Sequence, residues 1–271
     1  SIPATVTSLN SASLTKADLL RVTLEHASTS TLPEVSEATS PFASNVKVYV
    51  SKGVKTLLLN GGDSWAGVAK ANIFEDGDVS TIFSDGTFWY TVKKYDAANW
   101  DYEVVLDSLV SKIATAYTIP DSVKYATADT YKYKVTEIGA SAFAGITKAL
   151  TIVIPSTVQA IDAKAFDTDN YPKYVVLPKT PATGMTIAAD AFKSKVKFYT
   201  EATAPVDGWT NIKSNEITIP TGVSKAYTDK GFTKAYVLGD ENSIYSEGGV
   251  WYQVYNATNT QAAAINPVDM S

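Results

Sequence analysis

A short motif that recurs along the chain constrains its fold more than any other feature of the sequence. The segment Ile-Gly-Ala-Ser-Ala-Phe at residues 138–143 returns as Ile-Asp-Ala-Lys-Ala-Phe at residues 161–166, which is 23 positions later. A third copy, Ile-Ala-Ala-Asp-Ala-Phe, begins 26 positions further on, at residue 187. Self-similarity with a period of about 20 to 50 residues is the mark of a repeat architecture. We therefore predict a chain of stacked structural repeats.

The motif at residues 138–143 is followed by a segment that has the pattern of a β-strand. In residues 150–154 every second residue is aliphatic, as expected of a strand with one face on a core. Pro155 ends that strand because it has no N–H to donate to the ladder. In the next copy, the small Ala of the motif leaves room for Phe166 to fill the space between neighbouring coils. One unit buries too little apolar surface to offset the entropy of ordering its residues, so we expect the units to stack through parallel ladders.

A longer duplication lies over the short repeat. Residues 42–49 match residues 192–199, an offset of 150, and residues 82–92 match residues 244–254, an offset of 162. The second pair consists of aromatic and β-branched residues around a Gly-bearing turn, which is typical of β-hairpins. We expect modules in tandem, each with an opening β-meander, a short stack and a closing unit.

The repeat motif resembles that of a known family. Ile-Gly-x-x-Ala-Phe followed by an aliphatic strand that ends in Ile-Pro is similar to the BspA-like leucine-rich repeats of bacterial surface proteins, and the similarity covers residues 138–178. The period of 23 to 26 residues also falls within the 20–29 residues of leucine-rich repeats. The chain departs from the family pattern after the Phe turn, where Ile146 and Asp169 stand in place of the usual Cys. The resemblance implies a role in adhesion or in binding host proteins.

These patterns predict a mostly β fold with short helical or turn segments. We expect leucine-rich-repeat solenoid modules in tandem, which are joined and capped by antiparallel β-hairpins and meanders. The expected domains are a first stack without its opening cap at residues 1–79 and a meander that opens the second module at residues 80–137. A second stack with its closing unit follows at residues 138–216, and a further, truncated meander at residues 217–271. Since Ser1-Ile2-Pro3 has the pattern of a strand end, we expect either that this chain was cut from a longer one or that a cap is supplied elsewhere.

Composition excludes several classes of function. The 271 residues include no Cys and one His, which excludes disulfides, thiolate sites and most His-based catalysis. A net charge of −5 offers no basic surface for nucleic acid, and no apolar run has the roughly 18–20 residues that span a bilayer. No basic and apolar signal segment begins at Ser1. We expect no enzyme, no cofactor and no metal centre.

The individual candidates for chemistry have simpler explanations. His26 follows the strand at residues 20–24 without a metal-spaced partner, so we expect it in a surface loop. The acidic segments at residues 74–78 and 167–170 favour turns, with calcium binding as the alternative because carboxylates are ligands that calcium prefers. Neither segment continues into a twelve-residue calcium loop. Nothing in the repeat places two carboxylates opposite one another, as glycoside hydrolysis requires.

Strand alternation predicts a surface that binds a partner. If the aliphatic residues of each strand face inward, the residues between them form an exposed sheet face that mixes Tyr with Lys or Arg, a composition typical of recognition surfaces. The candidates on this face are Arg21, Lys47, Tyr49, Tyr174, Lys197 and Tyr199. The alternative is an ordinary solvated sheet, since Tyr and Thr are good strand formers.

Trp100 is the remaining candidate. The other four Trp recur at equivalent positions of two modules, which indicates packing, whereas Trp100 has no counterpart and lies in a polar hairpin tip.

We expect an extracellular or cell-surface bacterial protein, whose signal segment is absent from this chain. We expect it to mediate adhesion by binding a host or bacterial surface protein through its sheet faces. The alternatives are a glycan-binding module that depends on an exposed Trp, and a purely structural spacer.

Overall fold

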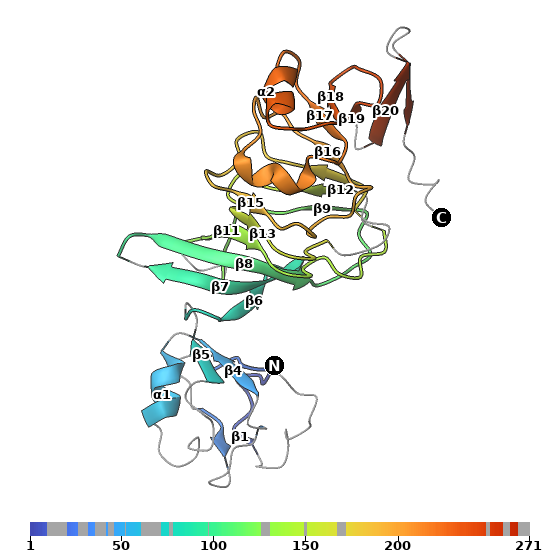
Figure 1. Ribbon diagram of the computed structural model, residues 1–271. Coiled ribbons are helices and arrows are strands. Elements are labelled where there is room, and N and C mark those ends of the chain that lie inside the picture. Colours follow the sequence, from blue (N-terminus) through green and yellow to red (C-terminus); the bar gives the residue numbers. More distant parts are fainter. Residues whose placement is uncertain are drawn as a thin grey trace. The chain divides into compact units, whose positions relative to one another are not determined.

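The fold is known for most of the chain. The computed structural model describes residues 1–9, 21–26, 32–35, 42, 46–51, 53–60, 72–75, 78–96, 98–125, 131–148, 151–166, 172–247, 250–256 and 261–264 (Figure 1). Strands far outnumber helices in these residues, which confirms the prediction of a mostly β fold. The chain divides into two compact units, one of residues 1–83 with 91–102 and the other of residues 84–90 with 103–271. None of the described helices has the length and hydropathy that crossing a membrane requires.

The first unit contains two small parallel sheets and a helix. One sheet pairs β1 with β3, and the other has the strand order β2-β4-β5. The elements are β1 (Ser8–Leu9), β2 (Arg21–Leu24), β3 (Glu34–Val35), β4 (Lys47–Val50), α1 (Val54–Asn60) and β5 (Ile73–Glu75).

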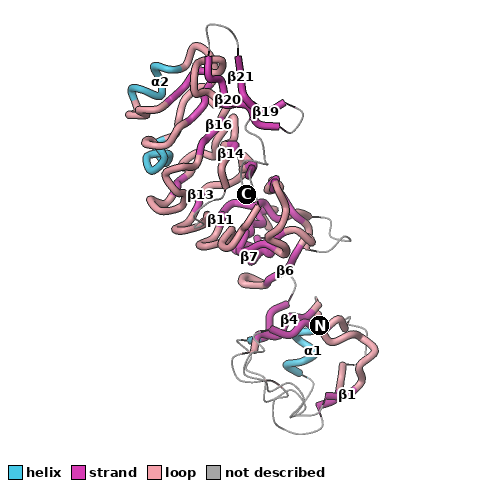
Figure 2. Tube along the Cα trace, turned by 90° about the vertical axis from the view of Figure 1, so that its right-hand side faces the viewer, coloured by secondary structure: helices cyan, strands magenta, loops and turns pink. Residues whose placement is uncertain are grey.

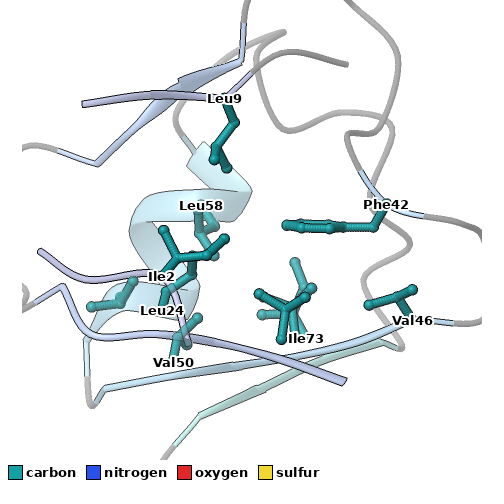
Figure 3. Packing of buried hydrophobic residues seen from close by; sticks show 11 residues of the cluster. Ile2, Leu9, Leu24, Phe42, Val46, Val50, Leu58 and Ile73 are labelled. Carbon is teal, nitrogen blue, oxygen red and sulfur yellow. The ribbon is translucent and has the colours of Figure 1, made fainter. Parts of the chain in front are cut away.

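Buried aliphatic residues of these strands form the core of the first unit. Figure 3 shows Leu24, Phe42 and Ile73 directed into one interior, which Leu58 of α1 closes from the helix side. Ile2 belongs to the same cluster and forms a parallel bridge with Leu24, so the sheet continues past the edge of β2.

The second unit and the hairpin that leads into it hold the remaining elements. They are β6 (Ile82–Ser84), β7 (Phe88–Asp96), β8 (Asp101–Leu109), β9 (Ala116–Thr118), β10 (Ser122–Val123), β11 (Tyr133–Ile138), β12 (Thr151–Val153), β13 (Ala160–Ile161), β14 (Tyr174–Val176), β15 (Thr186–Ile187), β16 (Lys197–Tyr199), the 3-10 helix η3 (Asp207–Ile212), β17 (Ile217–Ile219), α2 (Ser224–Asp229), β18 (Ala235–Val237), β19 (Ile244–Glu247), β20 (Val250–Asn256) and β21 (Gln261–Ala264).

The repeats build two sheets side by side. The sheet orders are β15-β13-β11-β8-β7-β6 and β18-β17-β16-β14-β12-β9, so from β11 to β16 the chain alternates between the sheets (Figure 2). Ile152 pairs in parallel with Val175, and Val175 pairs with Phe198, each 23 positions further along. The sequence period is therefore one step of a strand ladder. β17 and β18 extend the second sheet in parallel, so its ladder continues to Val237.

The Phe of each repeat lies in a column inside the second unit. The ring of Phe166 stacks on Phe143 with centroids 4.7 Å apart and on Phe192 with centroids 4.6 Å apart. The Phe166 N–H donates to the carbonyl of Ala191 at 3.0 Å, and Phe143 makes the equivalent bond to Ala165 at 2.8 Å. These Ala residues are buried, and their small side chains let successive turns approach closely enough for the rings to stack.

The two hairpins that the 162-residue offset relates have matching hydrogen bonds. The Val92 N–H donates to the carbonyl of Thr81 at 2.8 Å, and Val254 makes the same bond to Ser243 at 3.0 Å. The second copy continues as the antiparallel meander β19-β20-β21. The duplication seen in the sequence is thus also a duplication of backbone geometry.

Candidate functional site

The C-terminal meander covers part of the sheet face on which the sequence places Tyr174, Lys197 and Tyr199. The ring of Tyr174 stacks on Trp251 of β20, with centroids 5.1 Å apart and planes at 18°, and Tyr174 is only 3% exposed. The expectation that Tyr174 is exposed is therefore wrong. Strand alternation does place its side chain on the outer face of the sheet, but the meander forms a second layer over that face (Figure 2).

Polar contacts fix the meander in place. The indole Nε1 of Trp251 donates to Oγ1 of Thr151 at 2.7 Å, and the Ile244 N–H donates to Oγ1 of Thr218 at 2.8 Å. Ile244 and Trp251 also form a small apolar cluster with Tyr174. At Tyr174, the sheet face that the sequence assigns to an external partner is therefore an internal interface.

Lys197 and Tyr199 lie at the border of this interface and are partly exposed. The Nζ of Lys197 forms an ion pair with Oε2 of Glu216 at 2.9 Å and donates to Oε1 of Gln253 at 3.0 Å. The ring of Tyr199 meets Trp251 edge to face, with centroids 6.1 Å apart. Burial, with a smaller contribution from the Glu201 carboxylate, raises the pKa of the Tyr199 phenol.

In the first unit, the candidates do not form one exposed patch. Lys47 is exposed, but Tyr49 is 1% exposed and its ring stacks on Phe74 with centroids 5.3 Å apart. The expectation that Tyr49 is exposed is also wrong, because β5 brings an aromatic residue beside it. The backbone of Arg21 pairs with Lys47 in the parallel ladder, and the side chain of Arg21 lies outside the described residues.

Trp100 is the large apolar residue that the hairpin tip between β7 and β8 presents to solvent. It is 72% exposed, and its φ of 55° lies in the left-handed region that bulky side chains rarely adopt. Asp96 holds this turn, since its carboxylate accepts the backbone N–H of Asn99 at 3.1 Å and the side-chain Nδ2 at 2.8 Å. An ion pair between Lys94 and Asp101 closes the base of the tip. The structure places this candidate where the sequence predicts it.

We expect the conformation of the tip to depend on pH through Asp96. The hydrogen bonds from Asn99 hold the pKa of the Asp96 carboxyl below its usual value of 3.8. Because the folded-state pKa is the lower one, the stabilisation is complete above pH 3.8 and is lost as the pH falls through the folded-state value. The Trp100 indole N–H resonance in NMR spectra should shift in that acidic range. The same titration of Asp96→Asn should show no such transition, and an identical shift in this variant would contradict the assignment.

In the acidic turn at residues 74–78, the two described carboxylates, Glu75 and Asp78, have protein partners. Asp78 forms an ion pair with Lys55 at 2.5 Å and accepts the backbone N–H of Glu75 at 3.1 Å. The side chain of Glu75 in turn accepts the N–H of Gly53. The described residues contain no group of three side chains that would hold a metal ion. Asp76, Gly77 and residues 167–170 lie outside the described residues.

His26 is buried, which corrects the expectation of a surface loop. It is 0% exposed, and its Nε2 lies 3.1 Å from the carbonyl oxygen of Val6. The position directly after β2 therefore turns inward, where this hydrogen bond offsets part of the cost of burying a polar ring. A single polar residue after a strand gives no pattern from which this could be predicted.

Sequence analysis missed a groove where β14, β16, β17 and β18 end. We call it the strand-end groove; it has a volume of about 370 Å³ and its lining includes Lys179, Tyr199, Glu201, Pro220, Thr221 and Leu238. Lys179 and Thr221 each follow a Pro that ends a strand. The same pattern occurs at Ser156 after Pro155, which does not line the groove, so it does not locate the groove from the sequence.

The solved structures to which this chain is similar include leucine-rich repeat proteins of bacteria. A leucine-rich cell surface protein of Faecalibacterium prausnitzii is 16% identical, with a TM-score of 0.38, over 69% of this chain and 62% of its own. A leucine-rich repeat protein of Bacteroides capillosus is 20% identical, with a TM-score of 0.32, over 58% of this chain and 97% of its own. The pneumococcal vaccine antigen PcpA is 14% identical, with a TM-score of 0.30, over 65% of this chain and 54% of its own.

This chain spans less than two thirds of the Faecalibacterium protein. No protein-family model matches the chain, and no curated protein matches it.

Proposed function

We propose that this chain is a non-enzymatic repeat protein of the bacterial surface that binds a partner protein, and that its main contact residue is Trp100. The observation that carries the proposal is a Trp that is 72% exposed on a turn held by hydrogen bonds to Asp96. Exposed Trp residues are enriched among the few residues that dominate the energy of protein interfaces. The surface location rests on the resemblance of the motif at residues 138–178 to BspA-like repeats.

The architecture we propose is a set of solenoid modules in tandem, joined by meanders. The first stack occupies residues 1–79, the connecting meander residues 80–137, and the second stack begins at residue 138. Because β17 and β18 continue the parallel ladder, we place the start of the last meander at Ile244 instead of residue 217. Such stacks are rigid, so a partner binding to them loses little additional conformational freedom.

The backbone conformation of the hairpin tip is fixed before a partner binds. Holding Trp100 in the left-handed region costs on the order of 1–3 kcal/mol, which the Asp96 turn offsets before any partner arrives. Lys47 in the first unit, and Lys197 and Tyr199 in the second, remain separate candidates, and the exposed charge of Lys47 would mainly influence the rate of association. Tyr49 and Tyr174 are removed from the proposal because they are buried.

Replacing Trp100 with alanine tests the proposal directly. Against a panel of immobilised host matrix and bacterial surface proteins, we expect binding to at least one member, and a loss of about 2 kcal/mol or more in Trp100→Ala. That loss corresponds to a roughly thirtyfold weaker dissociation constant, measurable by surface plasmon resonance. Ile113→Ala is the matched control, because Ile113 is 70% exposed in another loop. Equal binding by both variants would exclude Trp100 as the contact residue.

A glycan is the second candidate partner, and the exposed indole of Trp100 is the observation that favours it, since sugars stack on open aromatic faces. A glycan array probed with the full chain and with Trp100→Ala separates the two candidates. Binding to glycans that Trp100→Ala loses, together with binding to no protein in the panel, would favour a glycan on Trp100. If the chain binds no protein in the panel and no glycan on the array, the proposed function is contradicted and a structural spacer is the remaining interpretation.

A further inference from the structure

The strand-end groove combines an apolar wall with a polar rim. Tyr199, Pro220 and Leu238 supply the apolar part, and Leu238 is 40% exposed although it directly follows β18. Lys179, Glu201 and Thr221 supply the polar part at the same opening. The volume of about 370 Å³ falls in the range of roughly 300–1,000 Å³ that is usual for small-ligand sites.

The polar rim carries one positive and one negative side chain, Lys179 and Glu201, whose charges cancel. The Nζ of Lys179 lies 3.4 Å from Oε2 of Glu201, and their side chains are 73% and 56% exposed. A pair this exposed contributes little to stability, so both groups are available to a ligand at little cost. A ligand with a net charge would be attracted by one member of the pair and repelled by the other.

Some of the backbone N–H groups at the groove already donate hydrogen bonds within the protein. The N–H groups of Thr200, Ala202 and Leu238 donate within the protein at distances of 2.9–3.0 Å. An extended peptide would need such groups to form a ladder, whereas a ring of hydroxyl groups needs side-chain donors and acceptors. The same bonds hold the groove in a fixed shape, which lowers the entropic cost of binding.

We propose that the strand-end groove binds a neutral sugar of one or two rings. The apolar face of the ring packs against Tyr199 and Leu238, and its hydroxyl groups bridge Lys179, Glu201 and Thr221. A hydroxyl group both donates and accepts hydrogen bonds, so neighbouring hydroxyls satisfy an ammonium and a carboxylate at once. This site does not include Trp100 and does not depend on the proposed binding of a protein.

Saturation-transfer NMR on the full chain tests this assignment. The probes are methyl β-glucoside, methyl β-galactoside, methyl α-mannoside and N-acetylglucosamine, with glucuronate and glucosamine as charged comparators. We expect transfer to at least one neutral probe and weaker transfer to its charged counterpart. Leu238→Arg, which fills the groove from an exposed position, should weaken binding about tenfold or more, equivalent to at least 1.4 kcal/mol.

Val110→Arg is the matched control, since Val110 is 47% exposed and does not line the groove. This variant and Trp100→Ala should bind the neutral probe as the unmodified chain does. Glu201→Gln should weaken binding without changing the circular dichroism spectrum. The assignment is overturned if no neutral probe binds, if Leu238→Arg binds as tightly as Val110→Arg, or if Trp100→Ala alone abolishes binding.

Discussion

Replacing Phe166 with alanine should lower the free energy of unfolding by about 3–5 kcal/mol. Phe166 is fully buried and is the middle ring of the column, with stacked neighbours 4.7 Å and 4.6 Å away on its two sides. Its removal leaves a cavity between two coils that cannot collapse, because the backbone N–H of the same residue is fixed to the carbonyl of Ala191. The substitution therefore removes both the buried ring and the stacking on each side.

Urea unfolding followed by circular dichroism measures this loss. Phe192→Ala is the matched control, because Phe192 is the terminal ring of the column and is only partly buried. We expect the control to lose less stability than Phe166→Ala. An equal or larger loss in Phe192→Ala would mean that the column does not carry the packing energy assigned to it.

Trp251→Ala should release the C-terminal meander while the stack stays folded. The substitution removes the stacking on Tyr174 and the hydrogen bond to Thr151, with a cost of about 3–5 kcal/mol for a buried Trp. Because the cluster joins the meander to the sheet and lies apart from the Phe column, the loss should be local. Amide hydrogen exchange in β19 and β20 should accelerate about a hundredfold or more, as a cost of about 3 kcal/mol implies. Exchange in β12 and β14 should change far less.

A phenol titration gives a second measurement of the same contact. Burial raises the pKa of Tyr174 to about 12, so its stabilising effect is complete below pH 10 and is lost as the pH rises through about 12. In Trp251→Ala the pKa of this phenol should fall back toward 10. Trp251→Phe keeps an aromatic face but loses the indole N–H and one ring, so it should retain more of the exchange protection than Trp251→Ala. An unchanged Tyr174 titration in Trp251→Ala would contradict the described interface.

The period of the sequence determines more of this fold than its composition does. The spacing of Ile138 and Ile161 predicts their pairing, because a residue that recurs once per coil meets its own copy in the next coil. Phe143 and Phe166 follow the same rule and lie stacked in one interior. The prediction of a meander from residue 217 is wrong for residues 217–237, which continue the parallel ladder with a sequence that does not repeat the motif.

The candidate site was harder to predict, and the reason is physical. Alternation along a strand predicts which side chains lie on the same face of a sheet. It does not predict whether another segment of the chain packs over that face. Tyr174 is covered by Trp251, 77 positions later in the chain, and Tyr49 by Phe74. Trp100 was located correctly because a residue at a hairpin tip has no second layer to cover it. The strand-end groove was missed because its lining comes from four strand ends and no motif connects them.

The strand ladder also sets a scale of length. Each repeat advances the structure by one strand, and neighbouring strands in a sheet lie about 4.7–4.9 Å apart. Deleting one complete 23-residue turn would bring β17 closer to β11 by that distance while leaving the fold of every other turn unchanged. The gain or loss of a single coil therefore changes the length of the stack by about 5 Å and leaves the segments at its two ends unchanged.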